Sequence, residues 1–254
     1  MQAEQKWPTI LYLVRHGESA GNVARDRAEA TQQPMIDIAS RDVDVPLSPL
    51  GERQAAALGS WFQSMSPPER PTVIRCSPYV RALTTATIVR DVGDFSEVPV
   101  VLDERLREKE FGILDRLTKF GIRMKYPEQA ELRRLVGKFY FRPPGGESWC
   151  DVILRLRSVI GTLTREYAGE RVLLVGHQVI VSCMRYLLEH LTEDEILRFD
   201  REHPIANCSV TSYAFDPSLG HAGRLVPALF NFVAPLEAAG EKVTSEKDAP
   251  VAPK

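Results

Sequence analysis

The chain has 254 residues, a length that suits one large domain or two small ones, and either can enclose a hydrophobic core. Its 32 Lys and Arg residues nearly balance 34 Asp and Glu residues, so the formal net charge is -2 and no general nucleic-acid surface is indicated. With 44% hydrophobic and 26% charged residues, the composition excludes a disordered or fibrous protein.

The cysteines and the hydropathy pattern give the class of protein. The 4 cysteines are far apart in the chain and form no C-x-x-C pair, so neither a zinc ribbon nor a redox motif is indicated. No apolar run approaches the roughly 20 residues that a membrane helix needs, and residues 1–8 lack the pattern of a signal peptide. We therefore expect a cytoplasmic protein with no membrane partner and no nucleic-acid partner.

Short apolar runs that end abruptly in polar residues predict the strands. Residues 9–14 (TILYLV), 72–76 (TVIRC) and 171–175 (RVLLV) are apolar, rich in β-branched side chains and without helical periodicity. Buried strands have this pattern. Residues 209–215 and 225–230 are further candidate strands.

Amphipathic patterns between these runs predict helices. Apolar residues recur with helical spacing after Ser48 and after Ser77. In both places serine suits the N-cap, and the proline that follows suits the first helical position. A third helix is predicted after Ser148, where Asp151 completes a capping box, and a fourth after His177. Alternating strands and helices predict an α/β fold, a three-layer α/β/α sandwich with a mostly parallel central sheet.

Two segments carry no strong pattern. Residues 20–45 lack a clear period and are predicted to form a long loop. Residues 235–254 are polar and nearly devoid of large apolar side chains. They are predicted to be a disordered tail that follows a domain of residues 1–234.

The candidate site lies where three predicted strands end. In open α/β sheets, ligands bind outside the carboxyl ends of the strands. Here those ends carry Arg15 and His16, then Arg81 one turn into a helix, then His177. A cation in the first turn of a helix opposes the helix dipole, so Arg81 indicates an anion beside it. Two arginines and two histidines in one crevice predict a site for a phosphate-sized dianion, because guanidinium groups offer forked donors to phosphate oxygens.

His16 is the candidate nucleophile of this site. A neutral imidazole can accept a phosphoryl group and pass it to water, and the neighbouring Gly17 lets backbone amides approach a ligand closely. His177 would then neutralise charge on the transferring group. A metal site made of His16, His177 and Glu108 is the alternative. Arginines beside the histidines would repel a cation, so neither a metal nor another cofactor is expected.

Six motifs carry a resemblance to a known family. In chain order they are LVRHGES (13–19) with Asn22, DVPLSPLGERQA (44–55), SPYVRALTTA (77–86), LREKEFG (106–112), GGES (145–148) and VGHQ (175–178). With these motifs the chain resembles the histidine phosphatase superfamily, in its phosphoglycerate mutase-like branch. The resemblance covers residues 9–215, and all six motifs stand in family order.

The resemblance implies roles for individual residues. His16 matches the histidine that becomes phosphorylated, and Glu108 matches the general acid and base. A carboxyl near the leaving oxygen can donate a proton and later accept one from water. Glu104 and Glu110 are the nearest competitors in the same acidic run. The residues that match the family's phosphate-holding groups are Arg15, His16, Asn22, Arg81 and His177.

The surroundings of the pocket indicate which activity to expect. Residues 140–151 are most similar to broad phosphatases and to fructose-2,6-bisphosphatases, but the latter carry a Lys and an Arg where this chain has Gly145 and Ser182. We therefore expect a phosphatase that hydrolyses a small phosphorylated metabolite through a phosphohistidine. Mutase or fructose-2,6-bisphosphatase activity, and a phospholigand-binding protein without turnover, are the alternatives. Segments 25–41 and 114–142 either cover the pocket or are plain surface, and the oligomeric state is left open.

Overall fold

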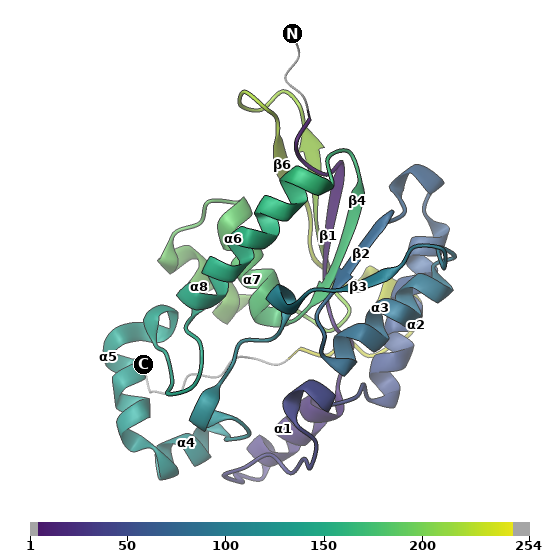
Figure 1. The fold of residues 1–254 in the computed structure, drawn as a ribbon. Helices are drawn as coiled ribbons and strands as arrows, with labels where there is room; N and C mark the ends of the chain where they lie inside the picture. The colour runs from purple at the N-terminus through teal and green to yellow at the C-terminus, as the bar shows by residue number, and fades with distance from the viewer. Residues whose placement is uncertain (1–4, 246–254) are drawn as a thin grey trace.

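The computed structural model describes residues 5–245 and shows a six-stranded sheet between helices (Figure 1). The strands and α-helices follow one another as β1 (Ile10–Arg15), α1 (Ala20–Ala30), α2 (Pro49–Ser64), β2 (Val73–Cys76), α3 (Val80–Val92), β3 (Val100–Leu102), α4 (Lys119–Lys125), α5 (Pro127–Tyr140), α6 (Trp149–Glu166), β4 (Arg171–Gly176), α7 (Gln178–Leu188), α8 (Glu193–Glu202), β5 (Val210–Asp216), β6 (Arg224–Phe232) and α9 (Ala234–Ala238). Short 3-10 helices are η1 (Asp42–Asp44), η2 (Pro67–Glu69), η3 (Glu104–Leu106) and η4 (Gly112–Leu114).

The sheet is mostly parallel, as predicted. Its strand order is β3-β2-β4-β1-β5-β6. Strands β3, β2, β4 and β1 run parallel to one another, whereas β5 is antiparallel to both of its neighbours, β1 and β6. The carboxyl ends of β1, β2 and β4 therefore meet at one edge of the sheet. Strand β3 was not predicted, because three residues are too few to show a pattern.

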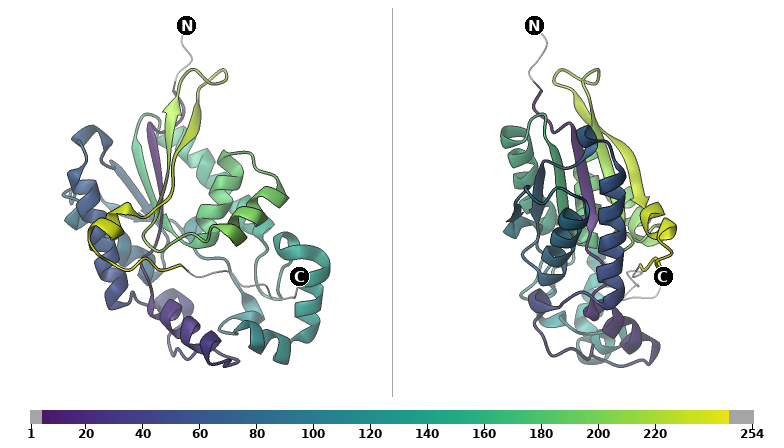
Figure 2. Two further views of the ribbon diagram at one scale, coloured as in Figure 1. Left: turned by 180° about the vertical axis from the view of Figure 1, so that it is seen from behind. Right: turned by 90° about the vertical axis from the view of Figure 1, so that its right-hand side faces the viewer.

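Helices cover both faces of the sheet and confirm the three-layer α/β/α sandwich (Figure 2). Leu11 and Leu13 of β1 pack toward α6 and α7, and Tyr12 and Val14 pack toward α2 and α3. Because successive side chains of a strand point to opposite faces, a strand covered on both sides has apolar residues throughout. This is why β1 is an unbroken apolar run. No helix within residues 5–245 is long and apolar enough to cross a membrane.

The prediction of a loop over residues 20–45 is wrong for its first part, which forms α1. The Ser19 hydroxyl accepts a hydrogen bond from the Asn22 N–H (3.1 Å), and the Asn22 side chain accepts one from the Ser19 N–H (2.9 Å). The buried residue of α1 is the small Ala28, so the helix has no apolar stripe and hydrophobic periodicity could not reveal it. The capping box was its signal in the sequence.

The predicted helix starts are confirmed at Ser48 and Ser148 and corrected at Ser77. The Ser48 and Ser148 side chains cap α2 and α6. Helix α3 instead has Tyr79 at its N-cap, without a side-chain hydrogen bond. The Ser77 hydroxyl lies 2.8 Å from Nε2 of His177, so a contact across the sheet edge has replaced the local cap.

The predicted disordered tail, residues 235–254, is wrong for the part that the structure describes. Helix α9 packs against α2, and the Leu236 side chain is fully buried there. The Gln54 side chain of α2 donates a hydrogen bond to the Lys242 carbonyl (2.8 Å). A buried leucine, hydrogen bonds to the backbone and to Thr244, and the Arg53–Glu241 ion pair hold this segment, and composition does not reveal such contacts. Residues 246–254 lie outside the described residues.

We expect Leu236→Ala to destabilise the protein, because truncating a buried leucine typically costs about 2 to 5 kcal/mol. For a chain of this size, the melting temperature should fall by at least about 5 °C. Thermal unfolding followed by circular dichroism measures this. Val243→Ala, in the same segment but 36% exposed, is the control and should change little. An unchanged melting temperature in Leu236→Ala would show that the segment is not docked.

Candidate functional site

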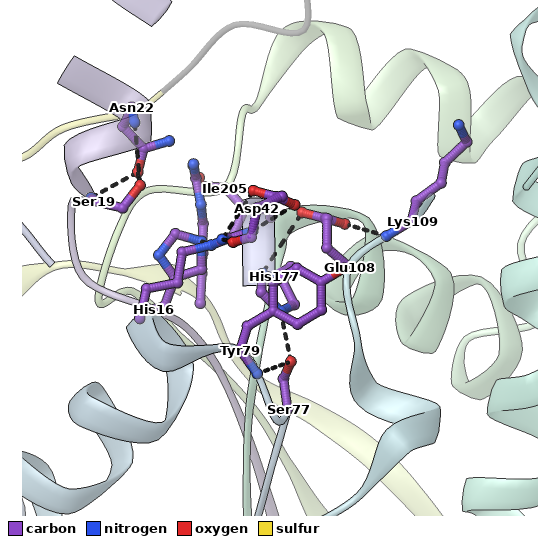
Figure 3. A network of polar contacts seen from close by, with 12 residues as sticks. His16, Ser19, Asn22, Asp42, Ser77, Tyr79, Glu108, Lys109, His177 and Ile205 are labelled. Atoms are coloured by element: carbon purple, nitrogen blue, oxygen red, sulfur yellow. Dashed lines mark hydrogen bonds and ion pairs between the residues drawn. The ribbon is translucent and has the colours of Figure 1, made fainter. Parts of the chain in front are cut away.

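Two neighbouring strands place the two histidines side by side. Strand β1 ends at Arg15 and β4 ends at Gly176, and these two residues are partners in the parallel ladder. His16 and His177 come directly after them. Their ring centroids are 5.1 Å apart, and both side chains are buried (Figure 3).

The hydrogen bonds of His16 define its tautomer. Its Nδ1 lies 2.7 Å from the Gly17 carbonyl oxygen, and since a carbonyl can only accept, Nδ1 must carry the proton. Its Nε2 accepts a hydrogen bond from Nε of Arg81 (3.3 Å). Burial, reinforced by the charges of Arg81 and Arg15, holds the pKa of His16 well below its usual value. His16 is therefore a neutral imidazole with a lone pair on Nε2.

Arg81 meets the anion that the sequence predicted beside it. Its Nη1 donates to the carbonyl oxygen and to Oδ1 of Asp42 (2.6 and 3.0 Å), and its Nη2 donates to Oδ2 (3.3 Å). Arg81 is only 5% exposed, whereas the Asp42 side chain is 43% exposed. A guanidinium can hold two phosphate oxygens in the same forked geometry. Asp42 thus occupies donors that a phosphoryl group would use.

Arg15 and Asn22 lie on the same side of the cavity as His16 and line it. Arg15 is buried, and its Nη1 donates to the Ile205 carbonyl (2.6 Å). Asn22 sits in the first turn of α1, where the capping box with Ser19 fixes its position. The sequence-predicted anion-binding residues are therefore brought together from β1, α1, α3 and the end of β4.

His177 joins the histidine pair to the acidic candidate. Its Nε2 contacts the Ser77 hydroxyl (2.8 Å), and its Nδ1 faces Oε2 of Glu108 at 3.7 Å. This Nδ1 is buried and makes no hydrogen bond with any described residue. Burial, then the charge of Arg81, lowers the pKa of His177 well below its usual value, so this imidazole too is neutral.

Glu108 is the acid that faces the cavity. Its side chain is 15% exposed, and its Oε1 accepts a hydrogen bond from the Lys109 N–H (2.8 Å). Burial raises the pKa of Glu108, so its carboxyl keeps a proton to higher pH than a free glutamate does. Among the described residues, the competitors Glu104 and Glu110 do not line this cavity. Glu110 instead accepts a hydrogen bond from the Tyr79 hydroxyl (3.3 Å).

The cavity has a volume of about 190 Å³ and a cationic wall. Segments 25–41 and 114–142, which the sequence assigned either to the pocket or to plain surface, both contribute residues to this cavity. The first adds Arg25, Ile36 and Ile38, among others, and the second adds Leu114, Ile122 and Phe141, among others. Besides Arg15, His16 and Arg81, the basic residues that line the cavity are Arg25, Lys109, Arg116, Lys119, Arg133 and Lys138.

Sequence reasoning missed several residues of the site. Asp42 directly follows segment 25–41, and nothing in the sequence around it marks it as a residue of the site. The Tyr79 ring stacks under the Arg81 guanidinium, 4.7 Å from its centroid, and contacts His177. Asn207 donates to the His16 carbonyl (2.9 Å) from a residue 191 positions away. Only the fold brings such distant residues together.

The C-terminal segment supports the loop that follows β1 and carries His16. Thr244 donates a hydrogen bond to the Asn207 side chain (3.0 Å), and Asn207 in turn holds the His16 carbonyl. Gln54 donates to the Thr244 hydroxyl (3.0 Å) and accepts a hydrogen bond from the Glu18 N–H (2.8 Å). The predicted tail is therefore part of the scaffold of the site.

The metal alternative needs a set of ligands around one point. Within residues 5–245, no group of three or more His, Cys, Asp and Glu side chains is placed to hold a metal ion. The charges of Arg81 and Arg15 act on both His16 and His177, and these charges oppose a cation.

Comparison with known proteins identifies the family. The model of the histidine phosphatase superfamily (branch 1) matches residues 11–225. The chain belongs to this superfamily. Phosphatases and mutases are the enzymes that it resembles, and the resemblance inferred from the six motifs is confirmed.

Three relatives illustrate the range of this histidine phosphatase family. The chain is 35% identical to a 6-phosphofructo-2-kinase/fructose-2,6-bisphosphatase of Caenorhabditis elegans over 70% of its own length, but only 33% of the worm protein. It is 30% identical to a 2,3-bisphosphoglycerate-dependent phosphoglycerate mutase of Gloeobacter violaceus, over 78% of this chain and 84% of that protein. A mycobacterial glucosyl-3-phosphoglycerate phosphatase structure with VO3 superposes with a TM-score of 0.67 at 25% identity, covering 89% of this chain and all of the other.

We expect Asp42→Asn to strengthen the binding of phosphate-like anions to this histidine phosphatase, because it removes a charge that competes for Arg81. Solvent screens the half-exposed carboxylate, so the inhibition constant for vanadate should fall by only about threefold to tenfold. Inhibition assays measure this, with Asp44→Asn as the control, since Asp44 pairs with the exposed Arg41 instead. Weaker vanadate binding in Asp42→Asn would mean that Asp42 orients Arg81 and does not compete.

Proposed function

We propose that the protein hydrolyses a small phosphomonoester by way of a phosphohistidine on His16. The observation that carries this proposal is the Nδ1 hydrogen bond to the Gly17 carbonyl. It leaves the Nε2 lone pair free of a proton, and this atom lies within 3.3 Å of a buried guanidinium. A neutral nucleophile next to fixed positive charge is what attack on a phosphate dianion requires.

The first step transfers the phosphoryl group. Nε2 of His16 attacks phosphorus, and the bond from phosphorus to the ester oxygen breaks. Glu108 gives its proton to the departing oxygen, so the product leaves as a neutral alcohol. Arg15, Asn22, Arg81 and His177 hold the phosphoryl oxygens, and the phosphoryl group takes over the Arg81 donors from Asp42.

The second step returns the enzyme to its starting state. Glu108, now ionised, accepts a proton from water as the water oxygen attacks phosphorus. The phosphorus–nitrogen bond breaks, and its electron pair returns to Nε2 of His16. Phosphate leaves, and no metal takes part because the two arginines supply the positive charge.

The positions of other cations favour hydrolysis of a monoester. Two arginines could replace the cations that fructose-2,6-bisphosphatases carry for a second phosphate, but both are engaged. Arg142 is paired with Asp151, and Arg185 is paired with Glu189. Among the described residues, neither arginine lines the cavity. A second phosphate would therefore lack the charge-assisted hydrogen bonds that these two arginines could donate, each worth about 1.5 to 3 kcal/mol.

Phosphoglycerate mutase activity is the second candidate, because the relative from Gloeobacter violaceus aligns over most of both chains. Such mutases use a pair of arginines for the second phosphate. Here only Arg133 of the neighbouring pair Arg133 and Arg134 lines the cavity, and Arg134 is paired with Glu131. The natural metabolite is not assigned, and the cytoplasmic location stays a prediction.

We expect each turnover of p-nitrophenyl phosphate to release one phosphate, without a bisphosphate primer and in the presence of EDTA. Rapid acid-free quenching with labelled substrate should trap an acid-labile, alkali-stable phosphoryl group on the protein, and His16→Ala should carry none. Equal labelling of His16→Ala would move the nucleophile elsewhere. Efficient primed interconversion of 2- and 3-phosphoglycerate, with little phosphate released, would favour the mutase.

Glu108→Gln should slow phosphohistidine formation by about a hundredfold to ten-thousandfold with an alkyl phosphate, because glutamine cannot donate a proton to the leaving oxygen. With p-nitrophenyl phosphate, whose leaving group needs little protonation, the loss should be smaller. In the wild type, the raised pKa of Glu108 keeps the acid protonated to higher pH. Formation from the alkyl phosphate should therefore fall as pH rises through that pKa.

The pH dependence of kcat/KM with the alkyl phosphate checks this expectation. The decrease in kcat/KM at alkaline pH should disappear in Glu108→Gln. The matched variants are Glu104→Gln and Glu110→Gln, which should behave like the wild type. An undiminished rate in Glu108→Gln, together with a loss in one of these variants, would transfer the acid role to that residue.

A further inference from the structure

The segment that carries Glu108 has no helix or strand of its own. Residues 107–111 lie between η3 and η4 and take part in no ladder of the sheet. A general acid must be held within a fraction of an ångström of its working position. Something other than secondary structure must therefore fix the Glu108 backbone.

Arg155 supplies the first part of this support. It projects from the second turn of α6, and its side chain is 11% exposed. Its Nη1 donates to the Arg105 carbonyl (2.5 Å), and its Nη2 donates to the Glu108 carbonyl (3.3 Å). One guanidinium thus links the Arg105 carbonyl of η3 and the Glu108 carbonyl of the irregular segment to helix α6.

Glu147 supplies the second part. Its two carboxylate oxygens accept hydrogen bonds from Nε and Nη2 of Arg155 (3.0 and 3.1 Å). The same oxygens accept from Nη2 of Arg107 (2.8 Å) and from the Glu110 N–H (3.1 Å). The Glu147 N–H also donates to the Glu110 carbonyl (2.9 Å). Glu147 therefore forms hydrogen bonds with Arg107 and Glu110, which lie on the two sides of Glu108 in the chain.

Arg155 and Glu147 form an ion pair, and we call this pair the brace because it holds the segment that carries Glu108. Burial alone would raise the pKa of Glu147, but the hydrogen bond and charge of Arg155 hold it below its usual value. Glu147 thus ionises more readily than a free glutamate, whereas burial raises the pKa of Glu108. The two carboxyl groups have opposite tendencies because Glu147 accepts hydrogen bonds from a guanidinium, whereas Glu108 accepts one only from a backbone N–H.

Neither brace residue faces the substrate. Glu108 and Lys109 line the cavity, but among residues 5–245 its lining includes neither Arg155 nor Glu147. We propose that Arg155 and Glu147 are positioning residues that hold Glu108 at the leaving oxygen and act on the reaction only through it. The inference rests on the proposed function, in which Glu108 is the general acid.

The brace has a kinetic signature that a general structural role would not have. Misplacing the acid affects a step in proportion to how much that step needs the proton. Arg155→Gln should therefore slow phosphohistidine formation from glycerol phosphate by about a hundredfold, and from p-nitrophenyl phosphate by less than about tenfold. A loss of stability alone would lower both rates equally, through the fraction of folded enzyme.

A double-mutant cycle on phosphohistidine formation is the decisive experiment. Rapid-quench rates with both substrates are measured for wild type, Glu108→Gln, Arg155→Gln and the double variant, each checked for folding by circular dichroism. If Arg155 acts through Glu108, the second substitution adds nothing once the first is present. Multiplying losses in the double variant would overturn the brace. No loss in Glu108→Gln alone would instead refute the proposed acid, so the two failures are distinguishable.

Two further variants separate geometry from charge. Arg155→Lys keeps the positive charge but replaces the planar fork by a single ammonium group. It should stay impaired with glycerol phosphate, and full recovery of the rate would overturn the geometric inference. Arg157→Gln changes an exposed arginine on the same helix and should match the wild type with both substrates.

Discussion

Two buried guanidinium groups set the conditions for the rest of the site. Arg15 and Arg81 are 3% and 5% exposed, and both stand beside the same pair of imidazoles. Burial, reinforced by their charge, lowers the pKa of His16 and His177, because a further positive charge in this buried space would be strongly opposed. The same arrangement leaves Nε2 of His16 without a proton and creates an environment that favours a dianion. In the structure, the Asp42 carboxylate supplies part of the negative charge that this environment favours, through its ion pair with Arg81.

The arginines can be held in this way only because the sheet brings them together. The carboxyl ends of parallel strands meet at one edge, and the ladder between β1 and β4 sets His16 beside His177. The loop after β1 is then held by residues from distant parts of the chain. Asn207 holds the His16 carbonyl, and Gln54 holds the Glu18 N–H. The C-terminal segment that packs on α2 completes this support at Thr244.

The proposed nucleophile, His16, and the proposed acid, Glu108, are held by different means. His16 extends a strand whose neighbours fix it by a regular ladder of hydrogen bonds, whereas Glu108 lies on irregular chain. Side chains replace the ladder there, and Arg155 with Glu147 provides donors and acceptors on both sides of the acid.

The sequence by itself predicted most of the strands and helices, and it supplied the proposal of which groups react. Buried strands such as β1 must be apolar on both faces, and polar residues at their ends, such as His16 and His177, have few structural reasons to be there. Helix α1 and the packing of Leu236 were not predicted, because one presents no apolar stripe and the other needs only a single buried side chain. The contacts of Asp42 and Arg155 depend on the tertiary structure alone. A charged residue with no marked pattern in the sequence acquires a role only when the fold places a distant partner beside it.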